Sequence, residues 1–230
     1  LAWYDNIPLL SWALLRARCR ACGVAISMRY PLVEAATGAL ALLALVYFGE
    51  TPYAAVAFAF TAALLLITFI DLDHRFIPDE VSLPGIAVGV AVAFLPGGVT
   101  PKDAVLGALL GGGILWAVAW GYERATGVEG MGLGDVKLLA MIGAFLGWQA
   151  VPTVLVVASL AGSVAGLGVM LVRGASRAGR RVARRLGVGA LAPFAQRAAR
   201  RTEIPFGPFL ALGAVLALYV PALVSFWRFG

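Results

Sequence analysis

The sequence predicts an all-α polytopic membrane protein with about seven transmembrane helices. Hydrophobic residues make up 61% of the 230 residues and charged residues only 13%, about half the charged share of an ordinary soluble domain. The mean hydropathy of +0.91 comes from long uncharged runs, each close to the roughly 20 residues that a helix needs to cross a bilayer. These observations exclude a soluble globular protein.

Uncharged runs define the predicted spans. They lie at roughly 31–49, 53–70, 81–96, 103–121, 135–149, 151–172 and 205–228. The fifth and sixth spans divide one uncharged run, 138–172, because its 35 residues are too many for a single crossing. Gly147, Trp148 and Pro152 predict the break between them. The third span is short and contains Pro84, which cannot continue the helical hydrogen bonds.

Lysine and arginine lie almost entirely in alternate loops, and this bias predicts the topology. The chain changes sides of the membrane at each span, and we call this alternation the parity of the loops. With the polar segment 1–30 placed in the cytoplasm, parity also places these loops there: 71–80, 122–134 and the basic loop 173–204. Together with Lys137, these segments hold all of the 18 basic residues except Lys102 and Arg228. We therefore expect a cytoplasmic N-terminal segment, 1–30, followed by a transmembrane domain, 31–230.

The net charge of +6 and the pI near 9.8 would suggest a nucleic-acid partner for a soluble protein. Nine of the arginines, however, lie between Arg173 and Arg201, beside apolar spans. Basic residues in that position set topology and bind anionic lipid, so we expect membrane lipids as partners and no nucleic acid. Apolar residues interspersed in the same segment leave an amphipathic surface helix as the alternative to a topology-setting loop.

Two acidic motifs lie next to predicted spans, where charge is costly and therefore indicates function. Asp71 follows the second span in the motif Ile70-Asp71-Leu72-Asp73, and Asp135 begins the fifth span in the motif Gly132-Leu133-Gly134-Asp135. The two residues are 64 positions apart, yet parity places both on the same face, at helix ends that could pack together. We predict that Asp71 and Asp135 form a catalytic pair.

Two carboxylates held together cannot both ionise cheaply, so one keeps a proton while the other is an anion. The anion can take a proton from water while the acid donates a hydrogen bond to a scissile carbonyl, as in aspartic proteases. This proteolytic chemistry needs no cofactor. Gly132 and Gly134 lack Cβ atoms and tolerate positive φ, which would let an extended peptide backbone approach Asp135.

Helix capping is the structural alternative for two of these aspartates. Asp135 is placed to cap a helix that starts at Val136, and Asp79 to cap one that contains Val81. For Asp79 we expect capping together with a supporting role near the substrate. For Asp135 the shared face favours catalysis, and a capping position would help it remain the anion.

Two further residues are assigned supporting or substrate-binding roles. Asp73 is two positions from Asp71 and points elsewhere on a regular helix. Lys137 lies in a first helical turn, where the dipole disfavours a cation. It is therefore expected to pair with a carboxylate, Asp135 among the candidates, or to reach toward lipid phosphate.

Cys19 and Cys22 have the spacing of half a zinc knuckle. A closed structural site needs four ligands, whereas the chain contains no other cysteine and its single histidine, His74, belongs to another motif. Two reduced thiols are therefore the expected state, and zinc binding would require a further cysteine pair. The chain opens with Leu1 and a polar stretch, from which we expect no signal peptide and an incomplete start.

The chain resembles the bacterial type IV prepilin peptidases, also called prepilin leader peptidase/N-methyltransferases. Six blocks in order carry the resemblance: Tyr4–Trp12, Arg18–Cys22, Ile26–Pro31 with Glu34, the Asp71 motif, Gly132–Asp135 and Ile204–Phe209. The motif at Gly132–Asp135 alone occurs in other intramembrane aspartic proteases, including presenilin-like ones. The six blocks together cover nearly the whole chain.

The resemblance implies a multi-pass enzyme of the bacterial inner membrane that cleaves the basic leader from prepilins and pseudopilins at the cytoplasmic face. It implies that Asp71 and Asp135 are the catalytic pair. Because the family's leaders are basic, we expect acidic residues on the cytoplasmic side to help hold them: Asp79, Glu80, Glu123 and Glu129. Many members also methylate the new N-terminus with S-adenosylmethionine. Members usually begin with another spanning helix and an upstream cysteine pair, so the resemblance implies eight spans in the complete protein and ties zinc binding to that pair.

A proton- or cation-coupled transporter that uses Asp71 and Asp135 as a relay is the alternative from another functional class. Parity argues against it, because both aspartates lie on one face and not at the bilayer midplane. The sequence leaves open the oligomeric state and the particular pilin substrate.

Overall fold

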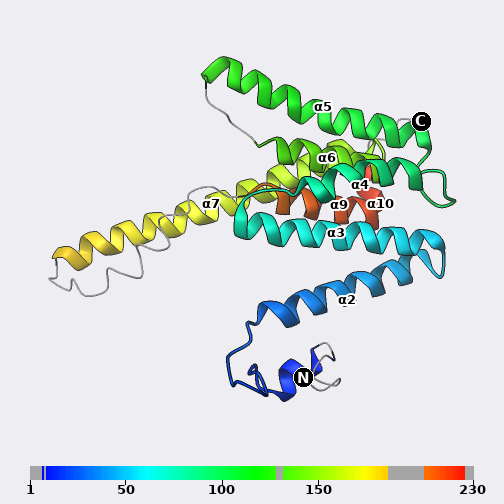
Figure 1. The fold of residues 1–230 in the computed structure, drawn as a ribbon. Helices are drawn as coiled ribbons and strands as arrows, with labels where there is room; N and C mark the ends of the chain where they lie inside the picture. The colour runs from blue at the N-terminus through cyan, green and yellow to red at the C-terminus, as the bar shows by residue number, and fades with distance from the viewer. Residues whose placement is uncertain (1–6, 8, 128–131, 186–204, 226–230) are drawn as a thin grey trace. The chain divides into compact units, whose positions relative to one another are not determined.

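The computed structural model describes residues 7, 9–127, 132–185 and 205–225. For residues 172–185 it describes the backbone alone. Every regular element in these ranges is a helix, which confirms the predicted all-α fold class (Figure 1). The helices are α1 (Leu10–Leu14), α2 (Arg29–Phe48), α3 (Pro52–His74), α4 (Asp79–Val92), α5 (Pro101–Thr126), α6 (Leu133–Leu146), α7 (Ala150–Arg185), α9 (Gly207–Tyr219) and α10 (Pro221–Ser225).

Each of the seven predicted spans contains a helix. The helix ends lie within a few residues of the predicted edges for the first five spans, whereas the last two spans differ more. Within the described ranges, α2, α3, α5 and the segment Ala150–Leu171 of α7 are long and apolar enough to cross a membrane. Gly207–Tyr219 is a shorter apolar helix, and α4 and α6 have 14 residues each. The last predicted span is divided at Val220, because Pro221 has no backbone N–H with which to continue α9.

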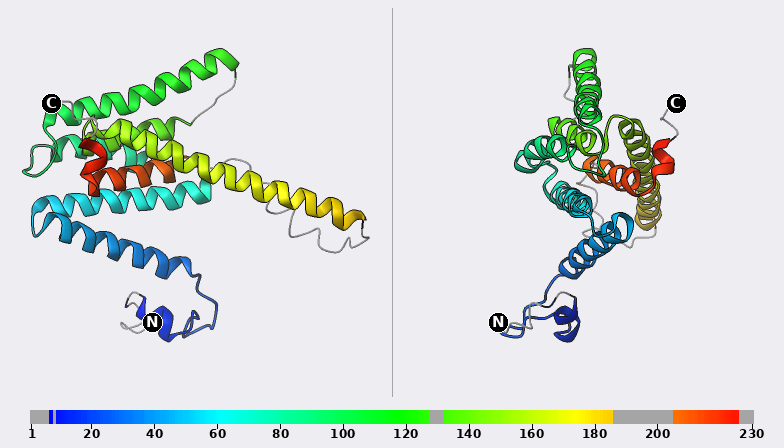
Figure 2. Two further views of the ribbon diagram at one scale, coloured as in Figure 1. Left: turned by 180° about the vertical axis from the view of Figure 1, so that it is seen from behind. Right: turned by 90° about the vertical axis from the view of Figure 1, so that its right-hand side faces the viewer.

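The sixth predicted span, 151–172, agrees with the apolar segment Ala150–Leu171, but the helix that contains it is longer than the span. Helix α7 continues to Arg185, well inside the segment that was expected to be a loop (Figure 2). Arginine and alanine are good helix formers, so a change from apolar to basic composition ends the apolar stretch without ending the helix. The rest of the predicted basic loop, 186–204, lies outside the described residues.

The chain divides into two compact units, Leu1–Leu65 and Leu66–Gly230. In the first unit, the segment before α2 is tied to that helix by the backbone N–H of Leu9, which donates to Glu34 Oε2 over 2.8 Å. Trp12 Nε1 donates to the carbonyl oxygen of Ile26 over 3.2 Å. These bonds order the residues on either side of Cys19 and Cys22. The predicted boundary between residues 30 and 31 stays a prediction.

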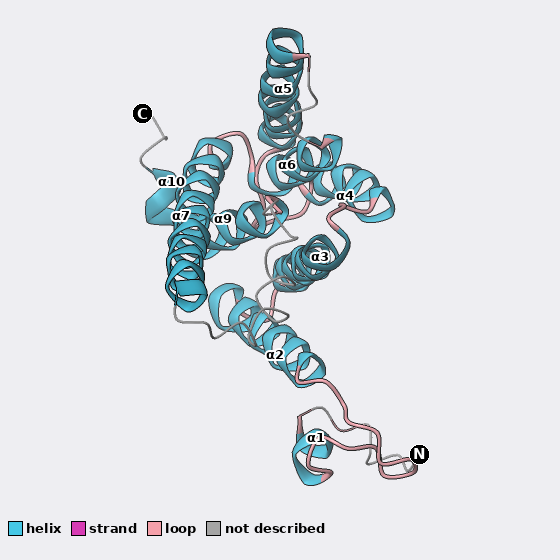
Figure 3. Cartoon of the chain, turned by 90° about the vertical axis from the view of Figure 1, so that its left-hand side faces the viewer, coloured by secondary structure: helices cyan, strands magenta, loops and turns pink. Residues whose placement is uncertain are grey.

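The second unit is built around α6, which packs against α4, α5 and α9, while α9 packs against α7 (Figure 3). All residues from Leu138 to Phe145 are buried. Glycines make this close packing feasible, because a Cβ on Gly107 of α5 or Gly143 of α6 would collide with the backbone carbonyl of the other. On α4, a Cβ at Gly85 would likewise collide with the side chain of Met141. Helix α6 therefore has a fixed position among its neighbours.

Candidate active site

Asp71 lies in the last turn of α3, with only 5% of its surface exposed. The backbone N–H of Gly207, the first residue of α9, donates to Asp71 Oδ2 over 3.0 Å. The first N–H groups of a helix have no partner within the helix, so this one is available to a side chain. The hydrogen bond joins positions 136 residues apart and holds the Asp71 carboxylate against the start of α9.

Asp135 is the third residue of α6 and is half-buried. It lies close enough to Asp71 for the charge of that carboxylate to act on it. The structure therefore brings together the end of α3 and the start of α6, the two helix ends that carry the predicted pair. Two neighbouring carboxylates of this kind can share one proton, which is the arrangement that acid–base cleavage of a peptide bond uses.

Ile77 forms the apolar contact between the acidic motifs and α9. It follows the end of α3 and is 7% exposed. A Cβ built on Gly134 would lie 3.0 Å from Ile77 Cβ, and one built on Gly207 would lie 3.3 Å from Ile77 Cδ1. Ile77 thus packs against one glycine next to Asp135 and another that is hydrogen-bonded to Asp71.

The two glycines of the second motif have different surroundings. Gly132 is exposed, and among the described residues a Cβ there would come no closer than 4.0 Å to another residue, so these residues leave this side open to a peptide. The face of Gly134 is occupied by Ile77, so its missing Cβ makes room for a side chain of this chain and not for a substrate. Neither glycine uses the positive φ that its residue type allows.

The capping roles considered for two aspartates are not found. Gly132 occupies the N-cap position of α6, which begins at Leu133, so Asp135 lies inside the first turn. The N-cap position of α4 is Pro78, so Asp79 is the first helical residue. Acidic residues in a first turn still interact favourably with the helix dipole.

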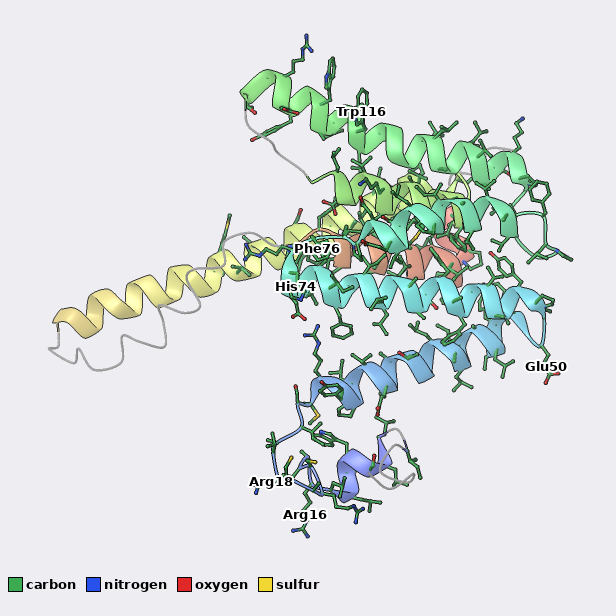
Figure 4. All side chains as sticks on the ribbon, viewed as in Figure 1. Arg16, Arg18, Glu50, His74, Phe76 and Trp116 are labelled. Carbon is green, nitrogen blue, oxygen red and sulfur yellow. The ribbon has the colours of Figure 1, made fainter. Side chains whose placement is uncertain are left out.

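Lys137 pairs with Asp79, and not with Asp135. Its Nζ lies 2.7 Å from Oδ2 and 2.8 Å from Oδ1 of Asp79, so the ion pair joins the first turn of α6 to the start of α4. Asp73 is exposed near the end of α3, as are His74 and Phe76, whose positions Figure 4 labels. The expectation of a carboxylate partner for Lys137 is confirmed, with Asp79 as that partner.

The loop from Cys19 to Val24 is closed by backbone hydrogen bonds. Cys19 N–H donates to the carbonyl of Val24, and Gly23 N–H donates to the carbonyl of Cys19, each over 2.9 Å. Gly23 has a φ of 68°, which favours glycine. Among the described residues, no group of three or more His, Cys, Asp or Glu side chains could hold a metal, so these residues do not complete a zinc site.

Gly207 and Ile77 are the site residues that sequence reasoning missed. Gly207 contributes a main-chain N–H, which leaves no signature in a search for chemical side chains, although it lies in the block Ile204–Phe209. Ile77 lies within the Asp71 motif, where only its acidic neighbours were singled out.

Comparisons with known proteins match nearly the whole chain. The type IV leader peptidase family matches residues 58–167, and the bacterial peptidase A24 N-terminal domain matches residues 1–48. A prepilin leader peptidase/N-methyltransferase of Aeromonas salmonicida is 40% identical over 223 residues, which are 97% of this chain and 69% of the relative. Proteins of the same name from Burkholderia pseudomallei (40% identity, 95% of this chain and 63% of the relative) and Myxococcus xanthus (46%, 79% and 53%) also match. No solved structure matches significantly.

Proposed function

Because this chain belongs to the type IV leader peptidase family, we propose that it is a membrane aspartic endopeptidase that cleaves leader peptides from type IV prepilins and pseudopilins. The observation that carries the proposal is the pairing of Asp71 with Asp135 between the end of α3 and the start of α6. Asp71 and Asp135 are also the residues that match the catalytic aspartates of the family's two acidic motifs. The relatives named above are peptidases, so the transporter alternative receives no support from them.

The proposed reaction is the attack of water on the scissile carbonyl between the two carboxylates. One carboxylate takes a proton from the water while the other gives its proton to the carbonyl oxygen, so neither peptide fragment becomes covalently attached to the enzyme. We propose that the peptide approaches Asp135 over Gly132, which the described residues leave open. Asp73 and the ion pair of Lys137 with Asp79 are proposed to support the site or contact the leader.

The protein is a multi-pass membrane protein with several membrane-spanning helices. The bias of lysine and arginine toward alternate loops supports placing the acidic motifs at the cytoplasmic face of the bacterial inner membrane. Basic leaders would meet the exposed acidic residues of this face, among them Asp73 and Glu80.

The relatives' names also include an N-methyltransferase activity, which supports a second step for this chain. In that step the methyl group of S-adenosylmethionine is transferred to the amine that cleavage exposes, with loss of a proton from the nitrogen. The N-terminal domain of the family matches residues 1–48, and this segment, which contains Cys19 and Cys22, is the part of the chain proposed to support the second step.

Substitution of either aspartate tests the proposal. Asp71→Asn and Asp135→Asn, reconstituted in liposomes with a prepilin, should each lose cleavage by at least roughly 100-fold, because each removes one partner of the acid–base pair. Glu50→Gln makes the same chemical change in an exposed turn and should retain wild-type activity. Mass spectrometry of the product reports cleavage and methylation together. Full activity in either aspartate variant would overturn the proposal.

A further inference from the structure

Building on the proposed peptidase activity, we propose that Gly207 is a positioning residue whose backbone N–H fixes Asp71 as the ionised base and leaves the proton on Asp135. The proposal assigns the acid and base roles within the pair. It rests on one hydrogen bond, on the space around Gly207 and on the charges that surround the two carboxylates.

Gly207 is placed so that only a glycine allows this contact. Its N–H donates to Asp71 Oδ2 over 3.0 Å in a buried position. A Cβ at residue 207 would lie 2.5 Å from the same oxygen, closer than real Cβ atoms come, and 3.2 Å from Asp71 Cγ, which is a tight contact. Any larger residue would therefore push the Asp71 carboxylate off the N–H. A carboxylate that accepts a backbone hydrogen bond is stabilised in its charged form.

The three helix ends around the pair have opposing effects. Asp71 lies in the last turn of α3, where the dipole disfavours an anion, but it also faces the start of α9, where the dipole favours one. These two contributions are similar in size and oppose each other. Asp135 lies in the first turn of α6, which favours its ionised form by roughly two- to fivefold. A hydrogen bond to a charged group is worth roughly 10- to 100-fold, so the Gly207 contact outweighs that dipole.

Donors and charges nearby agree with this assignment. No donor among the described residues reaches the Asp135 carboxylate, whereas the Asp71 carboxylate accepts the hydrogen bond of the Gly207 N–H. On α6 the remaining ionisable group is Lys137, which is paired with Asp79. Helix α9 has no ionisable side chain before Tyr219. The other ionisable residues at the end of α3, in the following loop and at the start of α4 are exposed: Asp73, His74, Arg75, Asp79 and Glu80. Tyr53, which is buried, lies in the first turn of α3, at the opposite end of the helix from Asp71.

The assignment defines where each proton goes. Asp71 takes a proton from water as the water oxygen bonds to the scissile carbonyl carbon, and Asp135 gives its proton to the carbonyl oxygen, which forms a gem-diol. Asp71 then gives its proton to the leaving nitrogen as the C–N bond breaks. Asp135 recovers a proton from one hydroxyl as the C=O bond reforms. The pair is returned to its starting state.

The pH dependence of prepilin cleavage distinguishes positioning from a merely structural role. In Gly207→Ala the displaced carboxylate loses its donor, so ionised Asp71 is less populated at acidic pH. We expect kcat/KM at mildly acidic pH to fall by roughly 10- to 100-fold, with recovery as the pH rises, so that the acidic limb of the profile moves to higher pH. Gly213→Ala on the same helix is the matched control, because its Cβ would lie 2.8 Å from the carbonyl oxygen of Val154 and far from the pair's hydrogen bond. Its profile should keep the wild-type shape.

A second variant removes the donor without adding atoms. Replacing the Gly207 amide N–H by an ester oxygen keeps the side-chain space and deletes only the hydrogen bond, so it serves even if Gly207→Ala does not fold. The same shift of the acidic limb is expected. A wild-type profile in the folded ester variant, or a faster reaction, would overturn the assignment. If the wild-type protein did not cleave a prepilin, or if Asp71→Asn kept full activity, the peptidase proposal itself would be refuted.

Discussion

The ion pair between Lys137 and Asp79 allows a choice between two roles for Asp79. In the structure Lys137 Nζ contacts both carboxylate oxygens, at 2.7 and 2.8 Å, and the pair joins α6, two residues after Asp135, to the start of α4. If the pair braces the first turn of α6, removing either partner should have the same consequence. If Asp79 instead attracts a basic leader, removing Lys137 should improve leader binding.

The size of the coupling follows from the exposure of the pair. The side chains of Lys137 and Asp79 are 30% and 51% exposed, so solvent screens much of their attraction. Exposed pairs contribute about 0.2–1 kcal/mol, and the two-oxygen contact places this one toward the upper end. We therefore expect a coupling of about 0.5–1 kcal/mol, which is a change of roughly two- to fivefold.

A double-mutant cycle measures this coupling. Asp79→Asn, Lys137→Gln and the double variant are compared for thermal unfolding in detergent and for KM and kcat with a prepilin at low salt. A brace predicts that both single variants lose stability and kcat in the same direction, and that the double variant loses less than their sum. High salt should reduce the difference from wild type. A higher KM in Asp79→Asn together with a lower KM in Lys137→Gln would refute the brace and favour leader binding.

Two further predictions concern stability. Gly143→Ala should lower the free energy of unfolding by about 1–3 kcal/mol, because its Cβ would collide with the backbone of Gly107; Gly113→Ala, which meets nothing within 4 Å, should be neutral or stabilising by up to about 1 kcal/mol in the same thermal scan. Asp103→Asn should lose about 1 kcal/mol, because Asp103 accepts hydrogen bonds from Trp148 Nε1 over 3.0 Å and from the hydroxyl of Thr100 over 2.7 Å. Prepilin cleavage should be retained in the folded Asp103 variant. Equal stability of Gly143→Ala and Gly113→Ala would contradict the first assignment, and a wild-type melting curve for Asp103→Asn would contradict the second.

Scarcity of charge is the reason that much of the fold could be predicted. With so few charged residues, each uncharged run is visible, and a helix is found in every predicted span. The end of α7 could not be predicted from the end of its apolar span, because composition reports polarity, whereas the helix continues to Arg185 through residues that favour helix. The division at Val220 depends on a single proline inside an apolar run.

The sequence allowed the catalytic side chains and their common membrane face to be predicted, but not the contacts that depend on how the helices pack. Asp71 and Asp135 could be placed on one face because the basic residues fix the order of the loops. The donor on Gly207 could not be predicted, because it is a main-chain N–H and its position depends on how α9 packs against its neighbours. The partner of Lys137 likewise depends on the packing of α4 against α6.

The most direct test of the central claim compares the rates of prepilin cleavage by Asp71→Asn, Asp135→Asn and the variant that carries both substitutions, all in liposomes. Residues that act as one acid–base unit are strongly non-additive. The account predicts that each single variant is as inactive as the double variant. Partial losses in the single variants that multiply in the double variant would contradict a shared catalytic pair.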